Sequence, residues 1–380
     1  MIPHSRPWIA DADVQVVTAI LRSEMIGQGA TTERFESALS HWLGLPAPGV
    51  AVSSGSAALQ LALLGLGVSS GDEVILPTYV CRSVSDAVRA AGGTPVLADV
   101  GPQGLLTASD VAPLIGLRTK AVIVPHLFGA FADVASFREF GVPIVEDCAQ
   151  AVDRPERWTL CGDAAVFSFH PTKCLTTGEG GLAVSLDGPL NARMRAIRDG
   201  RLASRALLAP MSDLAAALGL TQLGRYDHAL ARRRAIAREY RTALGDDAPL
   251  HLRRTPWDRT MHFRFVFTAP EGFEHAAAVF AARGVVVRRA VDTLLHRLDG
   301  RSDRMFPVAT EMFETTVSVP IYPALTDEEV ARVAGALAAW SYGTHQGPSG
   351  PGREALTRVD TRRLGGAPPA SGASYQSATM

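Results

Sequence analysis

The chain has 380 residues, of which 47% are hydrophobic and 20% are charged, and its formal net charge is −1. This length is enough for two packed domains, and a charge near zero gives no general attraction to nucleic acid or to an anionic membrane. The sequence has no N-terminal signal-peptide pattern and no apolar run of the roughly 20 residues that a membrane span needs, so we expect a cytoplasmic protein.

Four cysteines occur, Cys81, Cys148, Cys161 and Cys174, and they form no CxxC pair. A chain of this size does not need a disulfide framework, and free thiols in a reducing compartment are the simpler interpretation. The last three cysteines are spaced by 13 and 13 residues, which matches no common zinc pattern. We therefore expect no metal site.

The first half of the chain predicts an α/β architecture. Residues 11–44 have helical spacing on both sides of the turn "MIGQGATT", with a threonine as the expected cap of the second helix. From residue 49 onward, short apolar strands such as "EVILP" and "AVIVP" alternate with helical segments. Strands that are apolar on both faces are typical of a mostly parallel sheet covered by helices on both sides.

The second half predicts a smaller α+β unit. Residues 213–244 have the composition of one long connecting helix, and residues 250–340 alternate between strand and helix patterns. Beyond residue 345 the chain is rich in Gly, Pro, Ser and Ala without apolar periodicity, which predicts disorder. We expect a large domain over residues 1–235, a small domain over 236–345 and a disordered tail over 346–380.

Chemistry in a parallel sheet is expected where strands end and helices begin. The stretch "SSGSA", which contains Ser56 and Ala57, follows a short strand and can hold a phosphate with its backbone N–H groups, although it can also be an ordinary helix cap. Asp147 closes another apolar strand, where a buried carboxylate needs a cation or a donor; it too can be a helix cap.

The stretch "SFHPTKCLTTGEGG" contains the third candidate position. Of 37 Lys and Arg residues, only Lys120 and Lys173 are lysine, and Lys173 follows the strand-ending Ser168 by five residues. A partly buried lysine can lose its proton and attack a carbonyl, which arginine cannot do. A surface cation is the alternative. A lysine Schiff base with an aspartate at a pyridinium nitrogen is the arrangement of pyridoxal phosphate enzymes.

These stretches, in this order, resemble the DegT/DnrJ/EryC1/StrS family of fold-type-I aminotransferases. The resemblance runs from about residue 3 to residue 342 and rests on the blocks "SSGSAALQLAL", "GDEVILPTYV", "GGTPVLADV", "VPHLFG", "VEDCAQA", "FSFHPTKCLTTGEGGLAV" and "MSDLAAALGLTQL". It implies a large domain with a mostly parallel, seven-stranded-type sheet, a smaller α+β domain and pyridoxal 5′-phosphate as cofactor.

The resemblance also implies roles for individual residues. Lys173 matches the lysine that binds the cofactor, Asp147 the carboxylate at the pyridine nitrogen, and Gln150 the residue near the ring hydroxyl. The phosphate contacts match three positions, Ser56, Ala57 and Ser168. His170, Thr176, Thr177 and Glu179 lie in the lysine block, where they either contact ligand or shape the loop.

Two departures from the family pattern stand out. Many members stack an aromatic residue on the cofactor ring where this chain has Cys81, which would leave a roomier ring face. Members often carry an Asn and an Arg just before "MS" that reach the partner subunit, and the matching positions here are Leu208 and Pro210. These differences indicate an unusual substrate or different contacts between subunits.

The resemblance implies an aminotransferase with glutamate or glutamine as donor and a keto sugar, cyclitol or related ketone as acceptor. Arg288, Arg289 and His296 match positions where the small domain meets the cleft in relatives, and such arginines hold a phosphate or carboxylate or form a solvated turn. A homodimer is expected by analogy, with no nucleic acid or membrane partner. The alternatives are a sugar dehydratase or other elimination enzyme, which Lys173 argues against because related dehydratases carry histidine there, and a catalytically silent regulator.

Overall fold

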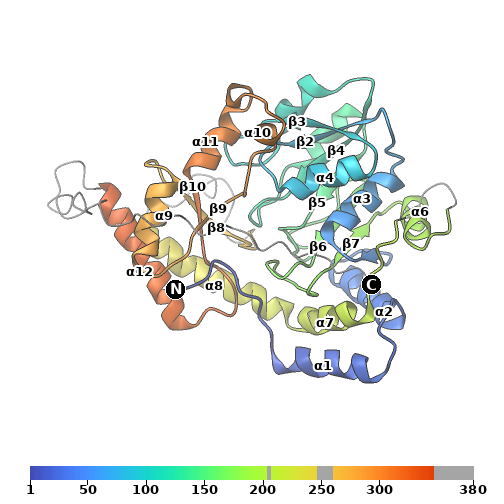
Figure 1. Cartoon of the computed structure of the whole chain (residues 1–380), viewed down its shortest axis with the longest axis horizontal. Helices are drawn as coiled ribbons and strands as arrows, with labels where there is room; N and C mark the ends of the chain where they lie inside the picture. Colours follow the sequence, from blue (N-terminus) through green and yellow to red (C-terminus); the bar gives the residue numbers. More distant parts are fainter. Residues whose placement is uncertain (203–206, 246–259, 346–380) are drawn as a thin grey trace, which may run out of the picture.

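The computed structural model describes residues 1–202, 207–245 and 260–345. The tail predicted to be disordered, 346–380, lies outside these ranges. Two sheets organise the described chain: a seven-stranded sheet with the order β1-β7-β6-β5-β4-β2-β3 and a three-stranded sheet with the order β8-β10-β9. Figure 1 shows the two sheets side by side, with the small sheet next to α9 and α12.

The large sheet is mostly parallel, as the alternation of strands and helices predicts. Its strands are β1 (Val50–Val52), β2 (Glu73–Pro77), β3 (Thr94–Ala98), β4 (Thr119–Pro125), β5 (Ile144–Asp147), β6 (Ala164–Ser168) and β7 (Gly181–Val184). The β7 strand pairs antiparallel with both β6 and β1, and the other neighbours are parallel. Nearly every residue of β4, β5 and β6 is buried, because helices and loops cover both faces.

Helices and short 3₁₀ turns connect these strands. They are α3 (Gly55–Gly65), α4 (Arg82–Ala90), α5 (Ala108–Val111), η1 (Ala112–Leu114), η2 (Val134–Phe140) and α6 (Gly188–Arg198). The α3 helix contributes seven buried residues to the core, which explains why its sequence is apolar on all sides. It begins directly after β1, so its N-terminus lies at the sheet edge where the candidate residues gather.

The small sheet is antiparallel and consists of β8 (Phe265–Thr268), β9 (Arg288–Arg289) and β10 (Thr316–Val319). Its flanking elements are α9 (Phe273–Ala281), α10 (Leu295–Leu298), η5 (Asp303–Met305), α11 (Pro307–Thr315) and α12 (Asp327–His345). Phe265, Phe267 and Phe280 pack with Trp340 of α12 in a separate apolar cluster. This unit therefore has a core of its own.

The beginning of the chain belongs spatially with the small sheet. Ile2 is buried in the small-sheet cluster and pairs with Val285, with hydrogen bonds from the Ile2 N–H to the Gly284 oxygen and from the Val286 N–H to the Ile2 oxygen. Figure 1 shows the N-terminus beside α8 and α12. Residues 2–6 thus cross from the small sheet towards the large one.

The prediction of one long helix over residues 213–244 is wrong. The segment forms two helices, α7 (Asp213–Gly224) and α8 (Tyr226–Leu244). Arg225 between them leaves the helical conformation, with φ −117° and ψ 11°. Gly224 favours a break because glycine is a poor helix former. The Arg225 guanidinium binds Asp13 of α1 (Asp11–Arg22). The α8 helix is continuous through residue 235, the position at which the sequence predicts a domain boundary.

The expected threonine cap of the second helix, α2 (Ala30–Trp42), is also wrong. The N-cap residue is Gly29, and Asp213 at the start of α7 supplies the acceptor. Its carboxylate accepts hydrogen bonds from the N–H groups of Gly29, Thr31 and Thr32 at 2.8–3.2 Å and from the Thr32 hydroxyl at 2.7 Å. A residue 184 positions away in the chain caps the helix, which local sequence rules cannot detect.

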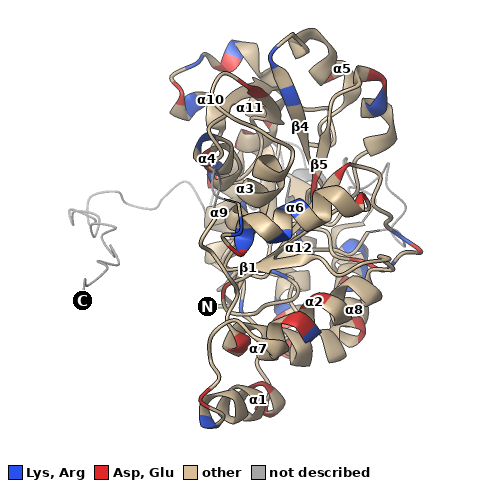
Figure 2. Cartoon of the chain, turned by 90° about the vertical axis from the view of Figure 1, so that its right-hand side faces the viewer, with Lys and Arg blue, Asp and Glu red and all other residues tan. Residues whose placement is uncertain are grey.

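Charged residues of both signs are interspersed along the ribbon in Figure 2, in keeping with the net charge of −1. Within the described residues, every helix is too short or too polar to cross a membrane.

We predict that Asp213→Asn lowers the free energy of unfolding by about 1–2 kcal/mol, because the cap of α2 loses its charge. Burial opposes ionisation of Asp213, but hydrogen bonds from Thr32, Thr31 and Gly29 hold its pKa below the ordinary value of 3.8. The stabilisation by the ionised Asp213 carboxylate is therefore fully present above the ordinary pKa. It is lost as the pH falls through the lower pKa of the folded state. Urea denaturation at pH 7 and at pH 3 measures both effects. Asp11→Asn, at an exposed position of α1, is the control and should change little.

Candidate functional site

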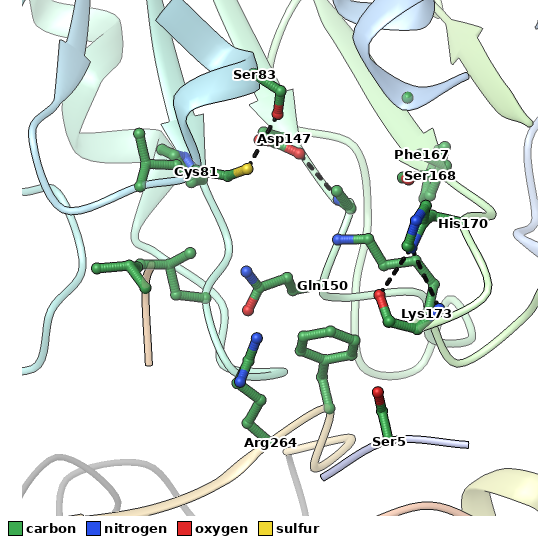
Figure 3. A pocket seen from close by; sticks show the side chains of 18 of the residues that line it. Ser5, Cys81, Ser83, Asp147, Gln150, Phe167, Ser168, His170, Lys173 and Arg264 are labelled. Atoms are coloured by element: carbon green, nitrogen blue, oxygen red, sulfur yellow. Dashed lines mark hydrogen bonds between the residues drawn. The ribbon is translucent and has the colours of Figure 1, made fainter. Parts of the chain in front are cut away.

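A cavity of about 420 Å³ lies between the carboxyl ends of the central strands and the small sheet. Its walls come from the ends of β5 and β6, the start of α3, the loop before α4, the N-terminal residues 4–6 and the small sheet. Figure 3 shows the side chains that point into it. Nine of the residues that the sequence pointed to as site candidates line this cavity: Ser56, Cys81, Asp147, Gln150, Ser168, His170, Lys173, Glu179 and Arg288.

Lys173 lies on the loop between β6 and β7, and backbone hydrogen bonds hold the loop in shape. The Lys173 N–H donates to the His170 oxygen at 2.8 Å, and the Phe169 N–H donates to the Gly180 oxygen at 2.9 Å. The Lys173 amine lies 5.3 Å from the centre of the Phe263 ring. Burial, together with nearby Arg264, lowers the pKa of Lys173, and Asp147 opposes that shift. A larger fraction of this amine is therefore free to act as a base or nucleophile.

Asp147 ends β5 and is buried, with its side chain facing the same space as Lys173 (Figure 3). Its Oδ1 atom accepts a hydrogen bond from the Ala149 N–H at 3.0 Å. Burial raises the pKa of Asp147, although Ala149 and Lys173 act in the opposite direction. A buried carboxylate with so few donors is suited to a cationic N–H group of a ligand. Gln150 accepts a hydrogen bond from the Phe128 N–H at 3.1 Å and borders the cavity.

Ser168 lies against the N-terminus of α3. A Cβ atom on Gly55 would lie 2.6 Å from the Ser168 Cβ, so only glycine allows this approach. Ser54 accepts a hydrogen bond from the Ala57 N–H at 3.1 Å, so Ser54 is an ordinary helix cap. The N–H groups of Gly55 and Ser56 are the first of the helix and have no acceptor within it. These N–H groups and the Ser168 hydroxyl are hydrogen-bond donors of the kind that suits an anion. Ala57 is buried and does not line the cavity.

Cys81 immediately precedes α4; its sulfur accepts a hydrogen bond from the Ser83 hydroxyl at 3.2 Å, and both residues border the cavity. His170 is exposed, and its Nδ1 atom lies 2.9 Å from the Thr172 hydroxyl. Thr176 and Thr177 shape the loop: their hydroxyls donate to the oxygens of Phe169 and Glu179, respectively.

The structure places two of these candidates, Arg289 and His296, away from the cavity wall. Arg289 points away from the cavity, where it binds Glu274 at 3.0 Å and the Phe313 oxygen. Neighbouring residues of a strand face opposite sides, so Arg288 faces the cavity and Arg289 does not. His296 is fully buried between Thr78 and Asp303, at 2.8 and 2.9 Å, and lies outside the cavity wall.

Leu208 and Pro210, which form the second departure from the family pattern, lie at the surface. Leu208 has 84% of its surface exposed. Pro210 pairs with Val52, and the Ser53 N–H donates to the Ala209 oxygen at 2.8 Å. Pro210 also borders a second, open hollow together with Thr177 and Glu179 of the lysine loop.

Glu146, next to Asp147, is buried and accepts four hydrogen bonds. Its Oε2 accepts from the His126 imidazole and the Trp158 indole, both at 2.9 Å, and its Oε1 accepts from the N–H groups of Cys161 and Gly162 at 2.6 and 2.5 Å. Burial opposes ionisation, but these donors lower the pKa of Glu146. In the described residues, Glu146, His126 and Cys148 form the one group close enough for a shared metal. The four donors already satisfy the Glu146 carboxylate, so this cluster has a structural role.

Several residues at the cavity have no signal among the sequence motifs, and they include His4, Arg233, Phe263 and Arg264. His4 is more than 300 positions away from its partner Ser318, so no local pattern could place it. Arg264 occurs in the alternating stretch "MHFRFVFTAP", where a charged residue looks like an ordinary exposed position. The signal that could have identified Arg264 is its charge among the apolar residues of a predicted strand.

Comparison with known proteins gives consistent matches. The family model of the DegT/DnrJ/EryC1/StrS aminotransferases matches residues 7–338. A dTDP-4-dehydro-2,3,6-trideoxy-D-glucose 4-aminotransferase of Saccharopolyspora spinosa is 31% identical over 366 residues, which cover 88% of this chain and 95% of that protein.

Solved structures agree. The aminotransferase TlmJ of Streptoalloteichus hindustanus superimposes with a TM-score of 0.82 at 30% identity, covering 91% of this chain and all of that one. The PLP form of a putative sugar aminotransferase, Spr1654 of Streptococcus pneumoniae, has a TM-score of 0.81 at 24% identity, covering 90% and 99% of the two chains, and it supports the fold.

We predict that Glu146→Gln lowers the free energy of unfolding by about 3 kcal/mol. Each Glu146 oxygen accepts two hydrogen bonds, so the glutamine NH₂ group must face two donors in either orientation. Glu73→Gln is the control, because Glu73 pairs with Arg118 on the surface, where the loss should stay below about 1 kcal/mol. Urea denaturation of both variants measures the difference, and equal losses would contradict the role given to Glu146.

Proposed function

The chain belongs to the DegT/DnrJ/EryC1/StrS aminotransferase family, and we propose that it moves an amino group from glutamate or glutamine to a keto sugar, cyclitol or related ketone. It is an aminotransferase, and its cofactor is pyridoxal phosphate. The observation that carries the proposal is the convergence of Lys173, Asp147 and Ser168 on one cavity.

The residues present fit this cofactor at both of its ends. The Asp147 carboxylate has one backbone donor among the described residues and faces the cavity, which suits a protonated pyridine nitrogen. The close approach of Gly55 to Ser168 creates an anion site of the kind that binds a phosphate. Pyridoxal phosphate supplies a carbonyl carbon that accepts amino groups and a ring that withdraws electrons from the bonds at that carbon.

Lys173 carries two parts of the proposed reaction. Its amine binds the cofactor between turnovers, which requires the unprotonated form that burial favours. With the cofactor and a substrate amine bound, the released Lys173 Nζ would be the base that takes and returns the proton at the substrate carbon. Phe263 packs beside the amine and limits the directions in which it can move.

Asp147 and Gln150 position the ring in this proposal. The Asp147 carboxylate holds a proton on the ring nitrogen, and a bound cation would lower the raised pKa of Asp147. Gln150 is held by the Phe128 N–H and borders the cavity, where it would lie near the ring hydroxyl. Cys81 borders the cavity where relatives carry an aromatic residue.

The acceptor side of the proposal rests on the relatives and on the lining of the cavity. The relative from S. spinosa is named for a dTDP-linked keto sugar. Ser5, Ser83 and His170 border the cavity with groups that exchange hydrogen bonds with sugar hydroxyls.

We further propose a homodimer formed through the face around α1. Four exposed large apolar residues, Val14, Leu21, Met25 and Ile26, lie on α1 and the turn after it, and Leu208 in the segment before α7 is exposed as well. Such exposed apolar residues are typical of an interaction surface. The hollow lined by Val17, Pro210 and Leu214 opens beside the lysine loop, so a second copy there would lie close to the site.

We predict that Lys173→Arg abolishes amino transfer, with a loss of at least about 10³-fold, because guanidinium cannot act as nucleophile or base. The measurement is the absorbance of the bound cofactor before and after addition of L-glutamate or L-glutamine. Lys120→Arg, which replaces the second lysine of the chain, should behave as wild type. A response of Lys173→Arg at the wild-type rate would rule out the role of Lys173, and a wild type that responds to neither donor would contradict the proposed donors.

We predict that Leu208→Asp converts the dimer to monomer at micromolar concentration, because a charge would be buried in an apolar interface. Leu208 is 84% exposed in one chain, so the monomer itself should fold unchanged. Light scattering after size exclusion measures the mass. Leu117→Asp, at another fully exposed leucine before β4, is the control. A dimer that survives in Leu208→Asp would place the interface elsewhere.

A further inference from the structure

Arg264, just before β8, brings a positive charge into the cavity without an acidic partner. Its Nη1 atom lies 3.4 Å from His4 Nε2 and 3.5 Å from the Ser318 hydroxyl, both at the outer limit of hydrogen bonding. Its Nε atom is buried and has no hydrogen-bond partner. Among the described residues, no carboxylate lies within 4.0 Å of the Arg264 guanidinium, the distance that defines an ion pair. A buried guanidinium with such weak partners is expected to bind an anion.

The groups around Arg264 increase the need for an anion. Burial lowers the pKa of Arg264, Asp292 opposes that shift, and Arg288, which faces the same cavity, adds to it. Burial, followed by the charges of Arg264 and Arg288, lowers the pKa of His4 to about 3, so His4 is neutral at physiological pH. The positive charge of this region therefore comes from the two arginines, with Asp292 as partial compensation.

The position of Arg264 decides which anion fits. Its guanidinium carbon lies 5.7 Å from the centre of the Phe263 ring, and the Lys173 amine lies 5.3 Å from the same centre. Figure 3 shows the Arg264 guanidinium and the Lys173 amine entering one space near Gln150, with Ser168 at the other end. The phosphate site at Ser168 is thus separate from Arg264.

We propose that Arg264, supported by Arg288, binds a carboxylate of the amino donor. An amino acid carries its α-carboxylate on the carbon that bears the reacting amine, so this anion must lie beside Lys173. The diphosphate of a nucleotide sugar is separated from the reacting carbon by the sugar ring and lies farther out. The planar fork of an arginine binds a carboxylate through two parallel hydrogen bonds. This assignment rests on the proposed transamination.

The first test measures anion binding without any reaction. Glutarate has two carboxylates and no amine, and its Kd for the full-length, cofactor-loaded protein is measured by calorimetry. We expect Arg264→Gln to raise this Kd at least tenfold and Arg264→Lys to raise it less, since lysine keeps the charge but not the fork. Arg289→Gln is the matched control, because Arg289 follows Arg288 in β9 but does not line the cavity and binds Glu274 instead. An unchanged Kd in Arg264→Gln, or no glutarate binding by wild type, overturns the proposal.

The second test separates the donor from the acceptor and from the proposed function. In Arg264→Gln the half-saturating concentration of L-glutamate in the cofactor absorbance assay should rise tenfold or more, whereas that of benzylamine, which has no carboxylate, should not. Weaker binding of dTDP with unchanged glutamate response would assign Arg264 to the acceptor and overturn the proposal. If wild type binds glutarate through Arg264 but reacts with no amino donor, transamination fails while the anion site stands. If Arg264→Gln does not fold, Arg264→Lys replaces it in both tests.

Discussion

The cavity depends on one buried carboxylate, Glu146, which ties together the ends of the central strands. Its four donors come from His126 after β4 and from Trp158, Cys161 and Gly162 before β6. The Ala132 N–H donates to His126 Nδ1 at 3.0 Å, so the proton of the neutral imidazole lies on Nε2 and faces Glu146. A fully satisfied carboxylate is stable in the core, and it fixes the backbone of the neighbouring Asp147.

The opposite wall of the cavity depends on a second buried charge. Arg233 of α8 donates from one nitrogen to the backbone oxygens of His262, Phe263 and Ile321, at 3.2, 3.2 and 2.7 Å. These hydrogen bonds attach both the segment before β8 and the segment after β10 to α8. Phe263 is thereby placed beside Lys173 and Arg264 at the cavity edge. Each wall is therefore held by a charged group with partners inside the protein: Glu146 binds two side chains and two backbone N–H groups, and Arg233 binds backbone oxygens.

Desolvation is the shared electrostatic feature of those charges. It lowers the pKa of Lys173 and of Arg264 and raises that of Asp147, so each charged form is less stable than in water. Ligands that carry complementary charges would relieve this cost: a ring cation at Asp147 and a carboxylate at Arg264. The arrangement gives the site a positive end and a negative end, and a cofactor and an amino acid have charges to match both.

Local patterns in the sequence were sufficient for the architecture and for the strand-end stretches. Apolar runs predict buried parallel strands, and Asp147, Ser168 and Lys173 follow such runs, so their meeting at one edge of the sheet follows from the parallel topology. Contacts between distant segments were decided only by the tertiary structure. Asp213 caps α2, His4 reaches Ser318, and Arg288 rather than Arg289 faces the cavity. Periodicity records which side of an element is apolar but not which distant residue packs against it, and that choice depends on how the two sheets and the N-terminal segment pack together.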